Sequence, residues 1–243
     1  QMKADGVRRA LAFVTSAFSS YSGCRQYRED IARARDAVGE GAPEIHKLRA
    51  FFNHPGFVRA VTDRARAALD QVPAGRRDHT SLLFTAHSVP LSMASTSDYV
   101  PQLKETAGLI SAALHREEWQ LVYQSRSGPP SQPWLGPDVS DALRQLAAGG
   151  ATDVVVVPLG FISDHMEVVY DLDTEARAIS ESLGLNMIRA GTAGTHPLFV
   201  SMIRELIEER LSGCPARSLG VFGPRENLCR EDCCPAPPRS LVR

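Results

Sequence analysis

Short runs of apolar, often β-branched residues alternate with longer amphipathic stretches along most of this 243-residue chain. The runs are apolar on both faces, which is typical of parallel strands covered by helices on two sides. Five runs predict strands: residues 11–16 (LAFVTS), 81–87 (SLLFTAH), 120–124 (QLVYQ), 153–159 (DVVVVPL) and 186–190 (NMIRA). The alternation restricts the chain to folds built on parallel sheets.

The stretches between the runs have the spacing of amphipathic helices. They predict helices over residues 24–38, 55–71, 100–115, 138–148, 164–183 and 197–211. Pro55 and Pro197 each stand in a predicted first turn, where a helix tolerates proline. Because strand–helix–strand connections are right-handed, the repeated units predict an α/β fold with a doubly wound parallel sheet.

Composition excludes several classes of protein. Hydrophobic residues make up 43% of the chain, enough for one large core or two small ones. The formal net charge of -1 gives no electrostatic case for a nucleic-acid partner. No apolar run approaches the roughly 18 residues that a membrane span needs, and a signal peptide is not evident. We expect a cytoplasmic protein whose sequence, starting at Gln1, begins partway into a longer one.

The ends of the predicted strands carry the polar residues of interest. In a doubly wound sheet, ligands bind outside the carboxyl ends of the strands. His87 ends the second predicted strand, and Pro90 closes it. The strand over 153–159 leads into Asp164, which we expect to cap the following helix. Neither a Walker nor a GxGxxG pattern follows any predicted strand, so no nucleotide cofactor is expected.

Three carboxylates follow at intervals of four residues: Glu167, Asp171 and Glu175. This spacing places them on one face of a helix, where like charges weaken an isolated helix by roughly a few tenths of a kcal/mol per pair. A line of oxygen ligands suits a hard divalent ion that would compensate the repulsion. Two simpler interpretations stay open, a solvated acidic face and, for His87, a buried or capping histidine.

Three motifs resemble those of the ferrochelatase family and occur in the family's order. Residues 85–90 (TAHSVP) resemble its histidine motif. Residues 123–126 (YQSR) with 133–137 (PWLGP) are similar to its next signature, and residues 158–167 (PLGFISDHME) with 170–173 (YDLD) to its glutamate motif. The resemblance runs from about residue 6 to 211 and includes residues 21–24 (YSGC).

The resemblance implies a chelatase-like fold of two Rossmann-like lobes with parallel sheets and a porphyrin cleft between them. A complete ferrochelatase carries a further N-terminal segment, so the first lobe would be incomplete in this chain. We expect residues 1–40 to be a remnant of that lobe and residues 41–190 to form the second lobe with the metal-site motifs. Residues 191–211 would be a helix packing back on the first lobe, and residues 212–243 a cysteine-containing tail.

The resemblance also assigns roles to individual residues. His87 would be the metal-site histidine, Glu167 the glutamate opposite it, and His165 a nearby catalytic partner. Asp171 and Glu175 would continue a line of metal ligands from His87 and Glu167, while Trp134 and Tyr21 would contact the porphyrin. Iron insertion must remove two pyrrole protons and the water shell of Fe²⁺. A neutral imidazole, with an unperturbed pKa of about 6.5, can accept a proton or ligate the metal. Which of His87 and Glu167 takes the protons is left open.

Four of the five cysteines lie in the last thirty residues, and Cys24 stands alone near the start. Some ferrochelatases hold a [2Fe–2S] cluster through one internal and three C-terminal cysteines, and here Cys24, Cys229, Cys233 and Cys234 match that pattern. Four thiolates are what such a cluster requires. Cys214 could replace Cys233 or Cys234. The alternative is a tail with free thiols, and the Gly-, Pro- and Arg-rich composition after residue 211 predicts a tail ordered only when something ligates it.

The implied reaction converts porphyrin and Fe²⁺ to heme and two protons, with porphyrin and ferrous iron as the partners. Residues 21–29 (YSGCRQYRE) resemble bacterial enzymes of the coproporphyrin-dependent route, which favours coproporphyrin III over protoporphyrin IX. A non-catalytic heme- or iron-binding module of the same fold and a chelatase for Co²⁺ or Ni²⁺ are the alternatives. Partner proteins are not indicated, and peripheral contact with a membrane stays open.

Overall fold

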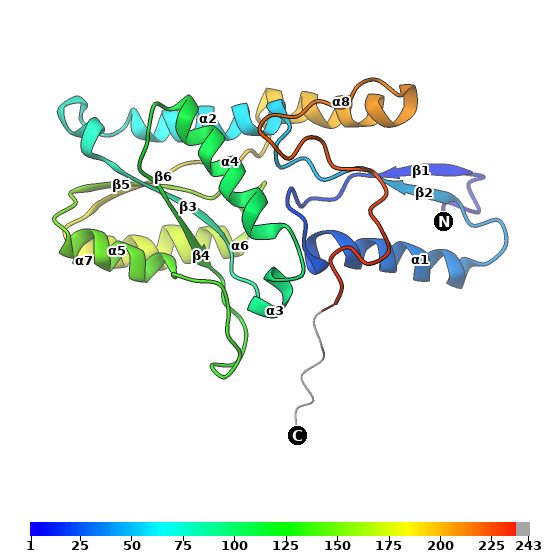
Figure 1. Cartoon of the computed structure of the whole chain (residues 1–243), viewed down its shortest axis with the longest axis horizontal. Coiled ribbons are helices and arrows are strands. Elements are labelled where there is room, and N and C mark those ends of the chain that lie inside the picture. The colour runs from blue at the N-terminus through cyan, green and yellow to red at the C-terminus, as the bar shows by residue number, and fades with distance from the viewer. Residues whose placement is uncertain (237–243) are drawn as a thin grey trace.

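A computed structural model of the chain describes residues 1–236, which form two parallel β-sheets at opposite ends of the molecule's long axis (Figure 1). The larger sheet has the order β4-β3-β5-β6. Its strands are β3 Ser81–His87, β4 Gln120–Gln124, β5 Asp153–Val157 and β6 Asn186–Arg189. The smaller sheet pairs β1 Arg9–Ala12 with β2 Glu44–Lys47. The predicted α/β class with parallel sheets is confirmed.

Helices cover both faces of the larger sheet (Figure 1). On one face lie α2 Pro55–Leu69 and α4 Tyr99–Ala113, and on the other α5 Val139–Ala148 and α7 Arg177–Ser182. At the smaller sheet, α1 Gln26–Val38 lies on one side, and α8 Pro197–Ser212 runs along α2 toward it on the other. The shorter helices are η1 Tyr21–Arg25, η2 Ala74–His79, α3 Leu91–Ala94, α6 Met166–Val168 and η3 Val169–Ala176.

Among the described residues, none of the helices has the length and apolar character that crossing a membrane requires.

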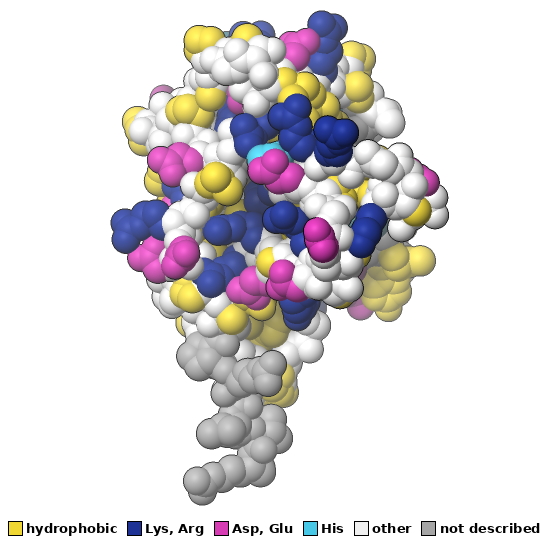
Figure 2. Space-filling model, turned by 90° about the vertical axis from the view of Figure 1, so that its right-hand side faces the viewer, with side chains coloured by type: hydrophobic (Ala, Val, Ile, Leu, Met, Phe, Trp, Pro, Cys, Tyr) yellow, Lys and Arg dark blue, Asp and Glu magenta, His cyan; other side chains and the backbone are white. Residues whose placement is uncertain are grey.

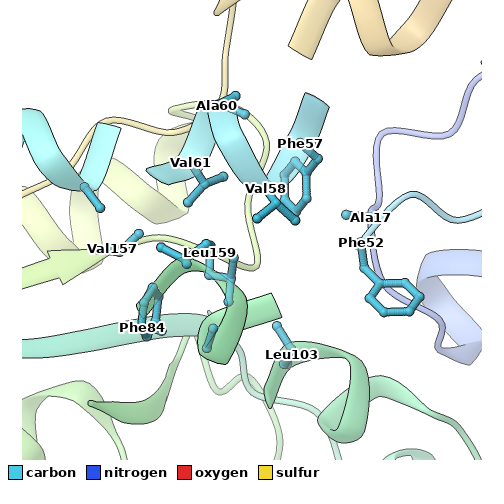
Figure 3. Packing of buried hydrophobic residues seen from close by; sticks show 14 of the residues in the cluster. Ala17, Phe52, Phe57, Val58, Ala60, Val61, Phe84, Leu103, Val157 and Leu159 are labelled. Atoms are coloured by element: carbon cyan, nitrogen blue, oxygen red, sulfur yellow. The ribbon is translucent and has the colours of Figure 1, made fainter. Parts of the chain in front are cut away.

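Aromatic packing joins the two sheets into one body. Phe13, just after β1, stacks on Phe51 with ring centroids 5.2 Å apart, and Phe51 meets Phe57 of α2 edge-on at 5.6 Å. Phe199 of α8 contacts all three rings. Figure 3 shows the same core continuing under α2, where Val61 faces the larger sheet. Burying rings of this size contributes a large share of the hydrophobic stabilisation.

A buried ion pair fastens the end of α8 to the segment after β2. Arg49 and Glu209 have side chains only 2% and 7% exposed, and the guanidinium binds the carboxylate through two hydrogen bonds of 2.7 and 2.9 Å. Arg49 also donates to the carbonyl oxygen of Arg217 at 2.9 Å. Because a buried charge left unpaired costs several kcal/mol, this pair fixes which segments meet here.

The end of the molecule that holds the smaller sheet and α1 carries Lys and Arg side chains interspersed with Asp and Glu (Figure 2). Arg33 and Asp30 form an exposed pair of opposite charge in this region, and Nε2 of the half-buried His46 lies 3.1 Å from Oε1 of Glu44. This mixture of signs agrees with the near-zero net charge of the chain.

Protein contacts hold the first part of the C-terminal tail. Asn53 donates to the carbonyl oxygens of Leu219 and Gly223, and Glu105 accepts from the backbone of Val221 and Phe222. The expectation of a tail ordered only by ligation is therefore wrong for this segment. Composition could not reveal that side chains distant in sequence satisfy its backbone. The last seven residues of the predicted tail, 237–243, lie outside the described residues.

The strands predicted at residues 81–87 and 120–124 are confirmed with the same bounds. The third and fourth strands of the larger sheet each end before the predicted residue, and β1 lies two residues earlier than its predicted start. β2 was not predicted, because its sequence EIHK has no apolar run. Edge strands of this length carry too little hydrophobic pattern to be recognised.

The predicted helix over residues 164–183 is present but begins and winds differently. It starts at Met166, is π-helical over Val169–Ala176, and His165 rather than Asp164 occupies the position before its first residue. The expectation that Asp164 caps this helix is wrong, because its carboxylate accepts a hydrogen bond from Arg189 instead. A charged guanidinium is a stronger partner for a carboxylate than a backbone N–H.

His54 starts α2 at the point where α2 crosses α8. Its Nδ1 accepts from the backbone N–H of Gly56 at 3.0 Å, so its Nε2 carries the proton and faces Glu205 at 3.4 Å. A Cβ at Gly56 would lie 2.7 Å from the Cβ of Met202 and 2.8 Å from the carbonyl oxygen of Leu198, so only glycine permits this crossing. The imidazole is thus enclosed by packed helices.

Burial, aided by the charge of Arg49, lowers the pKa of His54 to about 4. Between about pH 6.5 and 4, His54 is protonated in the unfolded chain but not in the folded chain. The free energy of unfolding therefore decreases as the pH falls through this window. We expect this difference at His54 to lower the free energy of unfolding by about 2 kcal/mol at pH 5 relative to pH 7.

Urea unfolding at both pH values would measure this loss in the unsubstituted chain and in His54→Asn, which keeps a capping acceptor but does not titrate. The variant should lose about 2 kcal/mol less between pH 7 and pH 5. Equal losses would show that His54 is not the group responsible.

Candidate metal and porphyrin site

His87 and Glu167 meet at the carboxyl edge of the larger sheet. His87 ends β3, Glu167 lies in α6, and Nε2 of the imidazole is 3.8 Å from Oε2 of the carboxylate. The two side chains are 33% and 54% exposed, so both can reach a bound molecule. One residue ends a strand and the other follows a different strand of the sheet, and the structure brings them together.

The imidazole of His87 is held in one orientation. Its Nδ1 lies 2.6 Å from the carbonyl oxygen of Ser88, and because a carbonyl only accepts, Nδ1 is the protonated nitrogen of the neutral ring. The lone pair of Nε2 then faces Glu167. This nitrogen is free to accept a proton or to ligate a metal.

The strand end that carries His87 is itself fixed on several sides. Tyr99 donates its hydroxyl to the carbonyl oxygen of His87 at 3.0 Å, and burial raises the pKa of that phenol so that it stays a donor. Ser88 bonds the backbone of Gln124 and Leu135. A Cβ at Gly160 would come within 2.7 Å of Ala86, so the loop after β5 packs closely against β3. The geometry of the pair is therefore preorganised.

His165 reaches the same region through an aromatic neighbour. Its ring centroid is 5.3 Å from that of Phe161, which in turn lies 6.5 Å from the ring of His87. His165 is exposed. It lies at the edge of the site.

The three predicted carboxylates share one side of α6 and η3. A π-helix bonds residue i to i+5 and an α-helix to i+4, so residues four apart stay near one face in both. Asp171 accepts from Ser125 and, at 3.2 Å, from Nε2 of Gln124. Glu167 and Glu175 are exposed. The acidic line thus contains one hydrogen-bonded carboxylate and two that face solvent.

The two predicted porphyrin contacts differ in their surroundings. Trp134 pairs with Pro90, three residues after His87, and its indole Nε1 is buried without a partner among the described residues. Tyr21 donates to Glu29 at 3.0 Å, and this bond raises the pKa of the phenol. The described contacts therefore bring Trp134 beside the strand end, whereas they join Tyr21 to α1.

Sequence reasoning missed the exposed apolar side chains around the pair. Leu91, Met166 and Tyr170 are 44%, 78% and 52% exposed, and they flank His87 and Glu167 in the chain. Met166 stands between two polar residues of the glutamate motif, which is the signal that could have identified it. Exposed apolar side chains mark a ligand-binding surface when they form a patch, whereas single ones are common on any protein.

Four of the five cysteines gather where η1 meets the tail. Cys24 of η1 is buried, and its side-chain hydrogen bond with Cys229 raises the pKa of Cys24 and lowers that of Cys229. The sulfurs of Cys233 and Cys234 are 3.6 Å apart, and burial raises the pKa of Cys234 to about 12. The left-handed backbone of Cys234, with φ of 51°, makes the turn that brings adjacent cysteines together.

Cys214 does not belong to this group. It is exposed just after α8, and no sulfur contact in the described part of the chain involves it. Arg25, by contrast, supports the group by donating to the carbonyl oxygens of Glu231 and Cys233 while pairing with Glu29. Within residues 1–236, no set of three or more His, Cys, Asp or Glu side chains is arranged to hold a single metal ion.

Comparison with known proteins identifies the family. The ferrochelatase family matches residues 1–211. Ferrochelatase from Rhodopirellula baltica is 52% identical over 241 residues, covering 98% of this chain and 68% of the relative. Coproporphyrin III ferrochelatase from Frankia alni is 53% identical over 252 residues, covering 98% of this chain and 65% of the relative.

The chain therefore spans about two thirds of the length of these relatives. The sirohydrochlorin chelatase SirB from Bacillus subtilis, solved with Fe³⁺, superposes with a TM-score of 0.59 at 15% identity, covering 88% of this chain and 77% of SirB. That likeness confirms the chelatase-like fold. On the family match and the identity to these relatives, the chain belongs to the ferrochelatase family.

Proposed function

We propose that the chain inserts Fe²⁺ into coproporphyrin III with release of two protons. The observation that carries this proposal is the approach of His87 and Glu167 to 3.8 Å at an accessible sheet edge. Relatives 44–53% identical to the chain, from Frankia, Nocardia and Streptomyces, are named coproporphyrin III ferrochelatases. These names favour coproporphyrin III over protoporphyrin IX as the substrate.

The spacing of the pair suits a shared metal ion. A divalent ion such as zinc binds imidazole nitrogen and carboxylate oxygen at about 2.1 Å each, so donors up to about 4 Å apart can ligate the same ion. In the neutral tautomer, Nε2 of His87 can also take a pyrrole proton. The iron is substrate here, and both residues act on it or on the protons that it replaces.

The neighbouring residues complete the proposed site. Asp171 and Glu175 extend the carboxylates away from His87, and a hydrated ion could pass along them because hard cations prefer oxygen ligands. His165 would serve as a further proton acceptor at the edge. Trp134 and Tyr21, with the exposed apolar side chains of Leu91 and Met166, would contact the porphyrin face.

Replacing His87 by alanine should abolish insertion while porphyrin still binds. Loss of a positioned base or ligand typically lowers rates by about 10²–10⁴-fold. Anaerobic mixing with coproporphyrin III and Fe²⁺, followed by growth of the heme spectrum, would measure turnover, and quenching of porphyrin fluorescence would measure binding. His79→Ala, at the opposite end of β3 and exposed, is the matched control.

Turnover retained in His87→Ala would refute the role of this residue. Absence of any heme spectrum with the unsubstituted chain would favour the alternative of a non-catalytic binding module. Comparable or faster insertion of Co²⁺ or Ni²⁺ would point to a chelatase for another metal.

Glu167→Gln keeps the shape of the side chain but removes its charge and its capacity to accept a proton. We expect kcat to fall by about 10²-fold or more, since a general base of this kind supplies that much. Steady-state insertion assays would measure the fall, with the exposed Glu181→Gln on α7 as control. Equal activity of the two variants would remove Glu167 from the mechanism.

We further propose that Cys24, Cys229, Cys233 and Cys234 hold a [2Fe–2S] cluster. The four thiols converge from two segments distant in sequence, and Lys47 adds a positive charge beside Cys24 and Cys229. A cluster held by four thiolates would supply binding free energy that ties the tail to η1. We also propose a cytoplasmic location, because five cysteines without a disulfide among the described residues suit a reducing compartment.

Cys229→Ser should remove the visible absorption of protein purified anaerobically, because three thiolates hold such a cluster poorly. Cys214→Ser should keep the absorption, since Cys214 is exposed and apart from the group. Visible spectra and iron content of both variants would measure the effect. Absorption that persists in Cys229→Ser would exclude the proposed ligand set.

A further inference from the structure

Arg189 ends β6 with a side chain only 16% exposed and binds two carboxylates at once. Its Nε and Nη2 donate to the two oxygens of Asp173 at 2.6 and 2.8 Å. Its Nη1 donates to Asp164 at 2.9 Å. The guanidinium therefore binds a different carboxylate on each of two sides. The hydrogen bonds to Asp173 raise the pKa of Arg189.

The two acids stand at the ends of residues 164–173, the segment that carries Glu167 and Asp171 of the proposed metal ligands. Asp164 comes just before His165 and Glu167, and Asp173 comes just after Asp171. The first helical turn of this segment lacks a side-chain cap. One arginine on a rigid strand thus anchors the segment at both ends, where a helix would otherwise depend on its own capping.

The same contacts neutralise some carboxylates of the segment and leave others without a cationic partner. Arg189 compensates Asp164 and Asp173. In the described part of the chain, Glu167 pairs only with His87, and Glu175 has no ion pair. The uncompensated negative charge is therefore concentrated on the side that faces the proposed metal site.

We propose that Arg189 is a positioning residue that fixes residues 164–173 so that Glu167 faces His87. The proposal rests on the proposed function, because it assumes that this pair binds a divalent ion. Arg189 itself touches neither the metal nor the porphyrin. Outer contacts that orient metal ligands typically contribute about 10–100-fold in metal affinity.

Arg189→Lys isolates geometry from charge. Lysine keeps the positive charge but offers no planar fork, so it cannot hold both carboxylates in the same arrangement. Arg177→Lys is the matched control: Arg177 is 45% exposed and approaches the same Asp173 at 3.8 Å. Asp164→Asn removes the charge of one of the two carboxylates that Arg189 binds. Because the side chain of Asp164 is 44% exposed, this substitution should leave the fold intact.

Binding of Mn²⁺ to the full chain, followed by electron paramagnetic resonance, gives a readout that does not require turnover. Mn²⁺ prefers carboxylate oxygen and avoids competition from the cysteines. We expect Arg189→Lys to weaken Mn²⁺ binding about tenfold and Asp164→Asn several-fold, with Arg177→Lys within twofold. Melting temperatures identify any variant that fails to fold, in which case Asp164→Asn carries the test.

Two results would overturn the proposal, and they differ in whether they also refute the proposed function. Unchanged Mn²⁺ affinity in folded Arg189→Lys or Asp164→Asn refutes the positioning role and leaves the proposed function standing. Mn²⁺ binding that is absent from the unsubstituted chain, or insensitive to Glu167→Gln, refutes both, because there is then no metal site to position.

Discussion

The close packing of the loop after β5 against the end of β3 is the constraint on which the site depends. β3 and β5 pair in parallel from Ser81 with Val154 to Phe84 with Val157, so their carboxyl ends open on the same edge. Gly160 then lies so close to Ala86 that any Cβ would collide. Because the loop must cross at this point, the segment that follows it is brought back over the edge, and Glu167 arrives beside His87.

The rest of the molecule supports that edge from the other side. Buried phenylalanines and the Arg49–Glu209 pair join the smaller sheet to the larger one. The helix η1 connects this part of the molecule to the site. The hydroxyl oxygen of Ser22 in η1 lies 3.7 Å from the sulfur of Met93 in α3, the helix that follows His87. The same η1 contains Cys24. The cysteine group and the proposed metal site are thus attached to neighbouring parts of one scaffold.

How much could be predicted from the sequence depended on how local each signal was. β3 was predicted with its bounds because a mostly apolar run ends at His87. The motif resemblance indicated Glu167 as its partner. β2 has no apolar run, and the amphipathic pattern of η3 does not distinguish a π-helix from an α-helix. The partners of Arg189 and the convergence of the cysteines depend on contacts between distant segments, which spacing alone cannot specify.

The proposed function requires one imidazole and one carboxylate to face the same tetrapyrrole. A crystal structure of the chain with coproporphyrin III bound tests it most directly. We expect a macrocycle lying over the carboxyl edge of the larger sheet, with its pyrrole nitrogens facing Nε2 of His87 and the carboxylate of Glu167. A porphyrin seated elsewhere, with both side chains pointing to solvent, would contradict it.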